Sequence, residues 1–344
     1  MATENPVSNA GTNRNSSRLS VSVHHVQAVL KHALRADVDP QKLLLRHRIS
    51  PRILKEPLAR VSVQQFADLQ TNTMQAMRDE ALGYAEIPLP LGSWDMMCHA
   101  VITTSTLGQA LTRYCRFFQL MGRGLPIDFD LATGTISIEQ YSGARGSYLP
   151  ELALINTHRF ACWLVQEELP LTRVRFRHSA AARAIDYKLM FVGNPVEFDQ
   201  PVHSLQFPEA LLDKPITQTP ESLRRYLRHP TLIMLTTSYS FGWTAKIRAH
   251  LRTDLDAMPE LTTVAGRLSL HPQTLRRRLA EEGTTFTQIK SDIRRDTALH
   301  FLSKKSLSVE EVAFRAGFSE SSAFIRAFKS WTGLTPYTYR KGLQ

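Results

Sequence analysis

Cysteines, long apolar runs and catalytic motifs are all scarce in this chain. Only three cysteines occur among 344 residues, at positions 98, 115 and 162. Because their number is odd and their spacing wide, we expect reduced thiols and a cytoplasmic location. No apolar run reaches the roughly 18 residues that a membrane-spanning helix needs, so no membrane partner is expected. Residues 1–18 lack the hydrophobic region of a signal peptide, and we predict a disordered tail over residues 1–20.

Known enzyme motifs are also missing. Gly122-Arg-Gly124 lacks the third glycine and the following helix of a phosphate-binding loop. The Gly-x-Ser-x-Gly turn that anchors a hydrolase triad does not occur. His24 and His25 are adjacent, so on a helix they point about 100° apart and do not form the metal-binding pair that residues four apart would form. We therefore predict no catalytic residue, no metal site and no cofactor.

Three other groups of residues allow both a functional and a structural interpretation. Cys98-His99 could be half of a zinc site, but a buried thiol beside a surface histidine is the simpler explanation. Asp128 and Asp130 share one strand face, where a solvated hairpin edge competes with a carboxylate pair. Four aromatic side chains at helical spacing could line an apolar effector pocket or belong to the core. They are Trp94, Tyr114, Phe117 and Phe118.

A repeated helical pattern dominates the last third of the chain. Its first copy runs from Leu261 to Leu279 and its second from Val309 to Phe328. The first helix of the pattern recurs after 48 residues, whereas the second helix recurs after 49. The one-residue difference falls in the turn between the helices, where an insertion is tolerated best. We predict two tandem helix-turn-helix units.

The second helix of each unit combines an apolar stripe with a polar face. Leu275 and Leu279 form the stripe of the first helix, and Phe324 and Phe328 that of the second. Such a helix can present arginine to guanine, glutamine to adenine and an aliphatic group to the thymine methyl in the major groove. A solvated face is the alternative for either helix alone, but two helices in register favour DNA. The predicted DNA-contacting residues are Gln273, Thr274, Arg276, Arg277, Ser321, Ser322, Ile325, Arg326 and Lys329.

A further helix is predicted between the two units, from Phe286 to Leu302. Thr285-x-x-Gln288 and Ser308-x-x-Glu311 have the pattern of capping boxes that start this helix and the next one. Seventeen residues of helix extend about 25 Å, which could hold the two reading helices about one DNA turn, roughly 34 Å, apart. Gly333 and Pro336 are expected to end the last reading helix.

These units and the tail that follows them resemble the DNA-binding domain of AraC/XylS-type transcription regulators. The similarity spans about residues 240–344 and implies promoter DNA and RNA polymerase as partners. Ser269 departs from the family pattern, because a glycine often stands in this turn, and Glu260 stands where the second unit has its Ser308 cap. The hallmark positions of the family are matched at Ala313, Gly317-Phe318, Phe324, Arg326, Phe328-Lys329, Gly333 and Pro336.

The charge distribution agrees with a nucleic-acid partner. The net charge is +11, and residues 246–341 contain 17 basic against 10 acidic side chains. Most of the excess positive charge therefore lies in under a third of the chain, as expected of a surface that binds polyphosphate. A membrane surface is the competing partner, but no basic amphipathic helix stands outside the two units.

The first two thirds of the chain have the pattern of an α+β domain over residues 21–214. A connector with one helix, Glu221–Leu227, and a turn at His229-Pro230 is expected over residues 215–240, before a DNA-binding domain at 241–344. Within the α+β part, helices are predicted around residues 26–34, 40–44, 61–77, 94–121 (with a break at 103–106) and 148–168, a hairpin at 127–138, and strands at 171–176, 196–198 and 202–207.

This N-terminal half resembles, more loosely, the sensing domain of the OruR-like, arabinose-binding-type subgroup of the same family. The resemblance implies effector binding and dimerisation here, without naming the effector or the residues that contact it. It is carried by Pro90-x-Gly92-x-Trp94, Thr106-Leu107-Gly108-x-Ala110-Leu111 and Gly193-x-Pro195-x-x-Phe198.

Together these patterns predict a sequence-specific, homodimeric transcription regulator, an activator that responds to a small-molecule effector. Its fold class is an α+β effector and dimerisation domain followed by an all-α domain with two helix-turn-helix units. One alternative is a dimeric regulator that needs no ligand. Another is an enzyme fused to a DNA-binding domain, such as a DNA-repair methyl acceptor, which would need an activated cysteine. Because the DNA-binding domain has its own apolar stripes and caps, we also expect residues from about 240 onward to fold independently.

Overall fold

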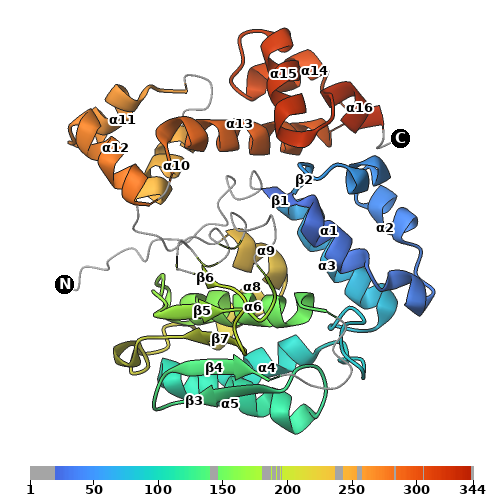
Figure 1. The fold of residues 1–344 in the computed structure, drawn as a ribbon, viewed down its shortest axis with the longest axis vertical. Coiled ribbons are helices and arrows are strands. Elements are labelled where there is room, and N and C mark those ends of the chain that lie inside the picture. The colour runs from blue at the N-terminus through green and yellow to red at the C-terminus, as the bar shows by residue number, and fades with distance from the viewer. Residues whose placement is uncertain are drawn as a thin grey trace, which may run out of the picture.

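The computed structural model places the C-terminal helices and the main β-sheet at opposite ends of the molecule (Figure 1). It describes residues 20–139, 146–179, 187, 191, 194, 196–236, 243–253, 258–282, 284–304 and 306–341. The predicted tail, except for Ser20, and the positions of Gly193 and Pro195 lie outside these residues. No helix within the described ranges is long and apolar enough to cross a membrane.

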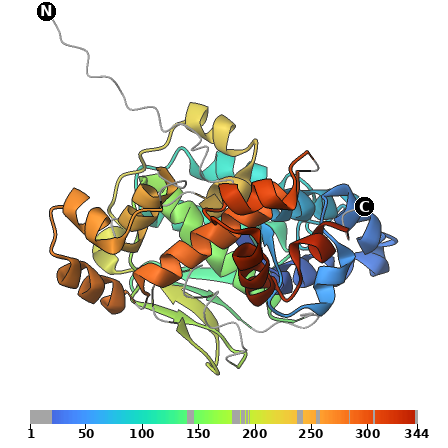
Figure 2. The ribbon, with the colours of Figure 1, turned by 90° about the horizontal axis from the view of Figure 1, so that it is seen from above.

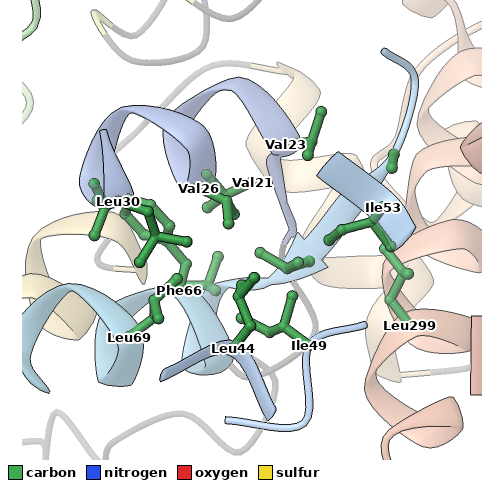
Figure 3. Close-up of a cluster of buried hydrophobic side chains, with 14 of the residues drawn as sticks. Val21, Val23, Val26, Leu30, Leu44, Ile49, Ile53, Phe66, Leu69 and Leu299 are labelled. Carbon is green, nitrogen blue, oxygen red and sulfur yellow. The ribbon is translucent and has the colours of Figure 1, made fainter. Parts of the chain in front are cut away.

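A layer of short helices forms the N-terminal part of the fold. Strands β1 (Ser20–Ser22) and β2 (Arg60–Ser62) pair antiparallel. Ser62 and Gln65 then form a reciprocal capping box that starts the third helix, and the side chain of Asp39 caps the second. The helices are α1 (Val23–Leu30), α2 (Pro40–Arg46) and α3 (Val63–Met77), and their apolar faces meet in one core (Figure 3).

A five-stranded sheet with its helices forms the middle of the chain, in strand order β3-β4-β7-β5-β6. Only β5 and β6 pair parallel, and the other neighbours pair antiparallel. The predicted hairpin is confirmed as β3–β4, and the α+β class is confirmed with it. The elements are α4 (Ser93–Val101), α5 (Leu107–Met121), β3 (Ile127–Asp130), β4 (Thr135–Ile138), α6 (Tyr148–Val165), β5 (Arg173–Arg175), β6 (Val196–Glu197) and β7 (His203–Gln206).

The segment expected to be a connector contributes to this fold. Helix α8 (Pro220–Tyr226) agrees with the predicted helix, but α9 (Pro230–Thr236) begins where a turn was expected. The reason is that proline is well tolerated in the first turn of a helix, so His229-Pro230 starts a helix here. Tyr226 and Met234 are buried in the same core as the helices of the sheet. Residues up to Thr236 therefore pack with the α+β part.

The C-terminal part consists of helices, as predicted (Figure 2). The helix between the two units occupies the predicted residues, whereas the first and last helices of this part were not recognised in the sequence. The elements are α10 (Trp243–Thr253), α11 (Leu261–Arg267), α12 (Pro272–Glu281), α13 (Phe286–Leu302), α14 (Val309–Arg315), α15 (Ser321–Thr332) and α16 (Pro336–Lys341).

The N-terminal layer shares its apolar core with the second half of α13 and with the second helix-turn-helix unit. Ile53 and Leu44 belong to the same buried cluster as Leu299, Val312 and Phe328. Figure 3 shows Leu299 beside Ile53 in this cluster. The first helix-turn-helix unit has a separate small core with α10 and the first half of α13. The two halves of α13 therefore face different partners.

A chain of polar contacts along α13 reinforces this arrangement. The hydroxyl of Ser20 donates to Asp296 Oδ1 at 2.5 Å and accepts from Arg60 Nε at 2.9 Å. Arg295 bridges Asp296 and Asp292, with N–O distances of 3.1 Å to each. Arg248 of α10 completes the chain with a 2.9 Å contact to Asp292. Since Asp296 is almost fully buried, these partners replace the water that its carboxylate would otherwise need.

The interface between the N-terminal layer and α13 affects whether the DNA-binding domain can fold by itself, as the sequence suggested. A chain cut near residue 240 would lose the N-terminal layer and expose part of the shared core, including Leu299. The carboxylate of Asp296 would also lose its hydrogen bond from Ser20. Exposing apolar surface costs about 25 cal/mol per Å². Independent folding of the fragment is therefore less favourable than the caps and stripes alone suggest.

We predict that Ser20→Ala lowers the free energy of unfolding by about 1.5–3 kcal/mol, because it removes a hydrogen bond to a buried carboxylate. Ser22→Ala is the matched control. Ser22 is buried in the same strand, but its hydroxyl has no hydrogen-bond partner among the described residues. Its removal should change the free energy by less than about 0.5 kcal/mol. Urea unfolding of the full-length chain measures both, and equal effects would contradict a specific Ser20–Asp296 contact.

Candidate nucleic-acid interface and effector cavity

The two helix-turn-helix units have the same turn geometry. In the first unit Leu270 N donates to Ala265 O at 2.9 Å, and in the second Phe318 N donates to Ala313 O at 3.0 Å. Gly317 adopts a left-handed conformation with φ of 79°, and Ser269, which occupies the equivalent position, has φ of 54°. Such a conformation favours glycine. The departure of Ser269 from the family pattern therefore changes the residue but not the turn.

Helix α12 presents three of its four predicted contact residues to solvent. Gln273, Arg276 and Arg277 are exposed, while Thr274 is half-buried. Arg276 donates to Gln273 Oε1 at 3.2 Å, and Arg277 lies 3.7 Å from Glu281. Exposed contacts of this kind contribute little energy, so both guanidinium groups are available to a ligand.

Helix α15 offers a narrower polar face than the sequence suggested. Ser322, Arg326 and Lys329 are exposed, but Ser321 and Ile325 are half-buried. Ile325 packs against the shared apolar core, which limits its reach towards a thymine methyl. The hydroxyl of Ser322 donates to Glu320 Oε2 at 3.3 Å. Glu320 was not recognised in the sequence, yet its exposed carboxylate stands at the start of the helix and could accept from cytosine N4.

Trp243 is a second residue that the sequence did not single out. Two cations lie over its ring, with Lys246 Nζ 4.7 Å and the Arg278 guanidinium 4.4 Å from its centroid. The carboxylate of Glu282 accepts from the backbone amides of Trp243 and Thr244 at 2.7 and 2.8 Å. These contacts join the start of α10 to α12 and so orient the first reading helix. No local pattern reveals the contacts with Arg278 and Glu282, because these residues are more than 30 positions from Trp243 and Thr244 in the sequence.

The predicted helix caps are present to different degrees. Ser308 and Glu311 form a full capping box. Thr285 accepts from Gln288 N, but the side chain of Gln288 donates to Asp292 instead of completing the box. Glu260 makes no cap hydrogen bond to α11 and accepts from Lys290 Nζ at 2.8 Å. This hydrogen bond from Lys290 lowers the pKa of Glu260.

A cavity of about 780 Å³ lies in the N-terminal part, among α3, α5, α6, the start of α9 and the segment before α4. Trp94, Tyr114 and Phe118 line it, whereas Phe117 does not. Of the four aromatic residues that could line an effector pocket or belong to the core, three therefore border a site large enough for a small molecule. This cavity lies apart from both reading helices.

The remaining candidate sites have structural roles. Cys98 is buried and His99 is exposed beside Asp95, as in the simpler interpretation. Asp128 and Asp130 are exposed on the hairpin. Burial raises the pKa of all three thiols, to about 11 for Cys162. No group of three or more His, Cys, Asp or Glu side chains in the described ranges could hold a metal ion.

Comparison with known families identifies both parts of the chain. The family described as the arabinose-binding domain of AraC transcription regulator, N-terminal, matches residues 38–216, over half of the chain. The chain belongs to the AraC family of transcription regulators. A helix-turn-helix domain family matches residues 264–342, which include both reading helices. The AraC-type chain is thus a transcription regulator with a helix-turn-helix DNA-binding part and a ligand-binding-type N-terminal domain.

Individual relatives agree with this assignment. The ornithine utilization regulator of Pseudomonas aeruginosa is 28% identical over 327 residues, which cover 93% of this chain and 96% of that protein. The regulator VqsM of the same organism is 35% identical over 99 residues, or 29% of this chain and 30% of its own. The solved structure of the regulator CdpR, also from P. aeruginosa, is 26% identical and covers 74% of this chain and 84% of its own. Its TM-score of 0.29 is too low to add to the description of the fold.

We predict that Ser269→Gly raises the free energy of unfolding by about 0.5–1 kcal/mol, because glycine adopts a left-handed conformation without the strain of a side chain. Gly317→Ser should lower the same quantity by a similar amount, since it introduces that strain in the second unit. Thermal or urea unfolding of the two variants checks this. If Ser269→Gly instead lowers the free energy of unfolding, the side chain of Ser269 stabilises the fold by more than its backbone strain destabilises it.

Proposed function

We propose that this AraC-family regulator binds promoter DNA as a homodimer in the cytoplasm, activates transcription through contact with RNA polymerase, and responds to a small molecule in the cavity described above. Gln273, Thr274, Arg276 and Arg277 would read bases from α12. Ser321, Ser322, Ile325, Arg326 and Lys329 would do so from α15. Phosphate contacts would supply much of the affinity and these side chains the specificity.

The exposure of both polar faces is the observation that carries this proposal. Arg276 and Arg277 on α12 and Arg326 and Lys329 on α15 remain exposed although the N-terminal layer is docked on α13. The N-terminal layer therefore leaves these groups free for a DNA ligand. Exposed guanidinium groups on two helices of equivalent turn geometry match the way tandem units approach a major groove.

The two alternatives have less support. A methyl-accepting enzyme needs a reactive thiolate, and the buried cysteines with raised pKa values hold their protons at neutral pH. The relatives and matched families are transcription regulators rather than enzymes. The cavity of about 780 Å³ supports a regulator that binds a ligand over one that does not.

Arg277→Ala and Arg326→Ala should each weaken binding to the operator by about 1–3 kcal/mol, since each would remove a bidentate contact to guanine. Fluorescence anisotropy against operator and random DNA at one salt concentration measures this. Arg224→Ala, which removes an exposed arginine of α8, is the control and should change neither affinity. Equal losses on operator and random DNA would show that Arg277 and Arg326 contact phosphates only.

The two helices should also differ in the sharpness of their base preference. Helix α12 offers Gln273, Arg276 and Arg277 for multidentate contacts, whereas on α15 Ile325 is half-buried and Arg326 is the one arginine of the polar face. We expect base substitutions under α12 to cost about 1–3 kcal/mol each and those under α15 less, with a shape-driven preference. A scan of single base-pair changes across the operator tests this order, and the reverse order would contradict it.

A further inference from the structure

We propose that the cavity of the N-terminal domain binds a small molecule with an apolar body and a protonated amine. The inference rests on the effector response proposed above and adds the chemical class of the effector. It follows from three properties of the cavity: its walls, its charges and its unpaired polar atoms.

The walls of the cavity favour an apolar or aromatic body over a sugar. Trp94 and Tyr114 meet edge to face with centroids 6.4 Å apart, and Tyr114 and Phe118 do so at 5.2 Å. Leu125 and Met234 are among the aliphatic side chains that continue this surface. A sugar would have to bury its hydroxyls against these groups, and an unpaired buried hydroxyl costs about 1–3 kcal/mol.

Four polar side chains at the cavity are already hydrogen-bonded within the protein. Asp68 accepts from Gln64 at 2.9 Å, and the His47 ring lies 2.9 Å from the Asn72 amide. The carboxylate of Glu80 accepts from the backbone amides of Gly92 and Trp94 at 2.7 and 2.9 Å. These four side chains are therefore only partly available to the hydroxyls of a sugar.

The charges that line the cavity favour a cation. Among the described residues around it, Asp68, Glu80 and Asp95 carry carboxylates, and Arg228, which is exposed, carries the only guanidinium group. Burial lowers the pKa of His47, which disfavours a positive charge on this ring. An anionic ligand would therefore be repelled by three carboxylates and attracted only by the guanidinium group of Arg228, whose charge is screened by solvent.

Glu80 is the carboxylate with most to gain from a cation. Burial raises its pKa, and the neighbouring carboxylates of Asp95 and Asp79 raise it further. Two backbone amides partly offset this effect. A protonated amine nearby would stabilise the charged form of Glu80 and would itself be stabilised.

Two lining residues have buried polar atoms without a hydrogen-bond partner among the described residues: Gln70 Oε1 and Trp94 Nε1. An amide oxygen can accept from an ammonium group, and the face of a tryptophan ring attracts a cation. Unpaired buried polar atoms are rare in proteins. An ammonium group would satisfy Gln70 Oε1, whereas Trp94 Nε1 is itself a donor and would need an acceptor on the ligand.

The test uses four probes with the full-length chain and isothermal titration calorimetry. They are 2-phenylethylamine, 2-phenylethanol, 3-phenylpropionate and L-arabinose, of which the first three carry one aromatic body and a cationic, neutral or anionic head. We expect the amine to bind at least about tenfold more tightly than the others, which corresponds to about 1.4 kcal/mol. Preference for the carboxylate or for L-arabinose, or no saturable binding of the amine, would overturn the proposal.

Variants locate the site and its charge. Asp68→Asn, alone and with Glu80→Gln, should weaken amine binding by about tenfold while binding of the alcohol stays constant. Glu209→Gln, which neutralises an exposed carboxylate far from the cavity lining, is the matched control and should change nothing. Arg228→Gln should leave amine binding unchanged or slightly tighter, and weaker amine binding would contradict the electrostatic argument. Ala153→Phe should weaken binding of all the probes by narrowing the cavity beside α6.

Two further measurements separate failure of the ligand class from failure of the proposed function. Circular dichroism verifies that each variant is folded. If the double variant does not fold, the binding measurement is made with Asp68→Asn alone. Operator affinity is then measured with and without the amine. Amine binding that leaves operator affinity unchanged would support the ligand class and contradict the effector response. A carboxylate or sugar that binds better and changes operator affinity would overturn the ligand class while supporting that response.

Discussion

The hydrogen bond between Ser20 and Asp296 joins the beginning of the described chain to the helix that carries both reading units. Because Asp296 is buried, its charge depends on Ser20 and Arg295. The layer cannot move away from α13 without exposing this carboxylate and the apolar surface around Leu299. The N-terminal layer and the second helix-turn-helix unit therefore form a continuous body, with a core that neither part completes alone.

The same arrangement limits how a ligand could influence DNA binding. The polar faces of α12 and α15 remain exposed although the N-terminal layer is docked on α13. The N-terminal layer therefore does not block DNA binding by covering these faces. Helix α3 lines the cavity along one side and directly follows β2, which packs against α13. A ligand that shifts α3 would change the position of α13, and with it of both helix-turn-helix units, relative to the N-terminal layer. Such coupling needs a different ligand affinity in each orientation.

Local signals in the sequence predicted most of this fold. The apolar periodicity and the Ser308 capping box located α13 and α14, and the left-handed glycine at Gly333 located the end of α15. The α+β class followed from alternating strands and a hairpin turn. Pro230 was misinterpreted because the same residue type starts helices and makes turns.

What the sequence did not predict depends on contacts between distant residues. Ser20 and Asp296 are 276 residues apart, and Trp243 meets Arg278 only in the folded chain. The half-burial of Ile325 comes from packing that a helical wheel of one helix does not contain. The aromatic residues of the cavity were visible as a group, but their helical spacing is equally typical of a core. Which of them border open space is decided by tertiary packing.

The uninterrupted helix α13 also fixes how the two helix-turn-helix units are placed relative to each other. Its first half is packed into the core of one reading unit and its second half into the core of the other. One added base pair moves two stretches of DNA apart by about 3.4 Å and rotates them by roughly 35° relative to each other. Because both ends of α13 are packed, the two reading units cannot adjust to this added distance or rotation without breaking one of the two cores. The regulator would therefore discriminate between operators by the distance between their contact segments as well as by the bases in them.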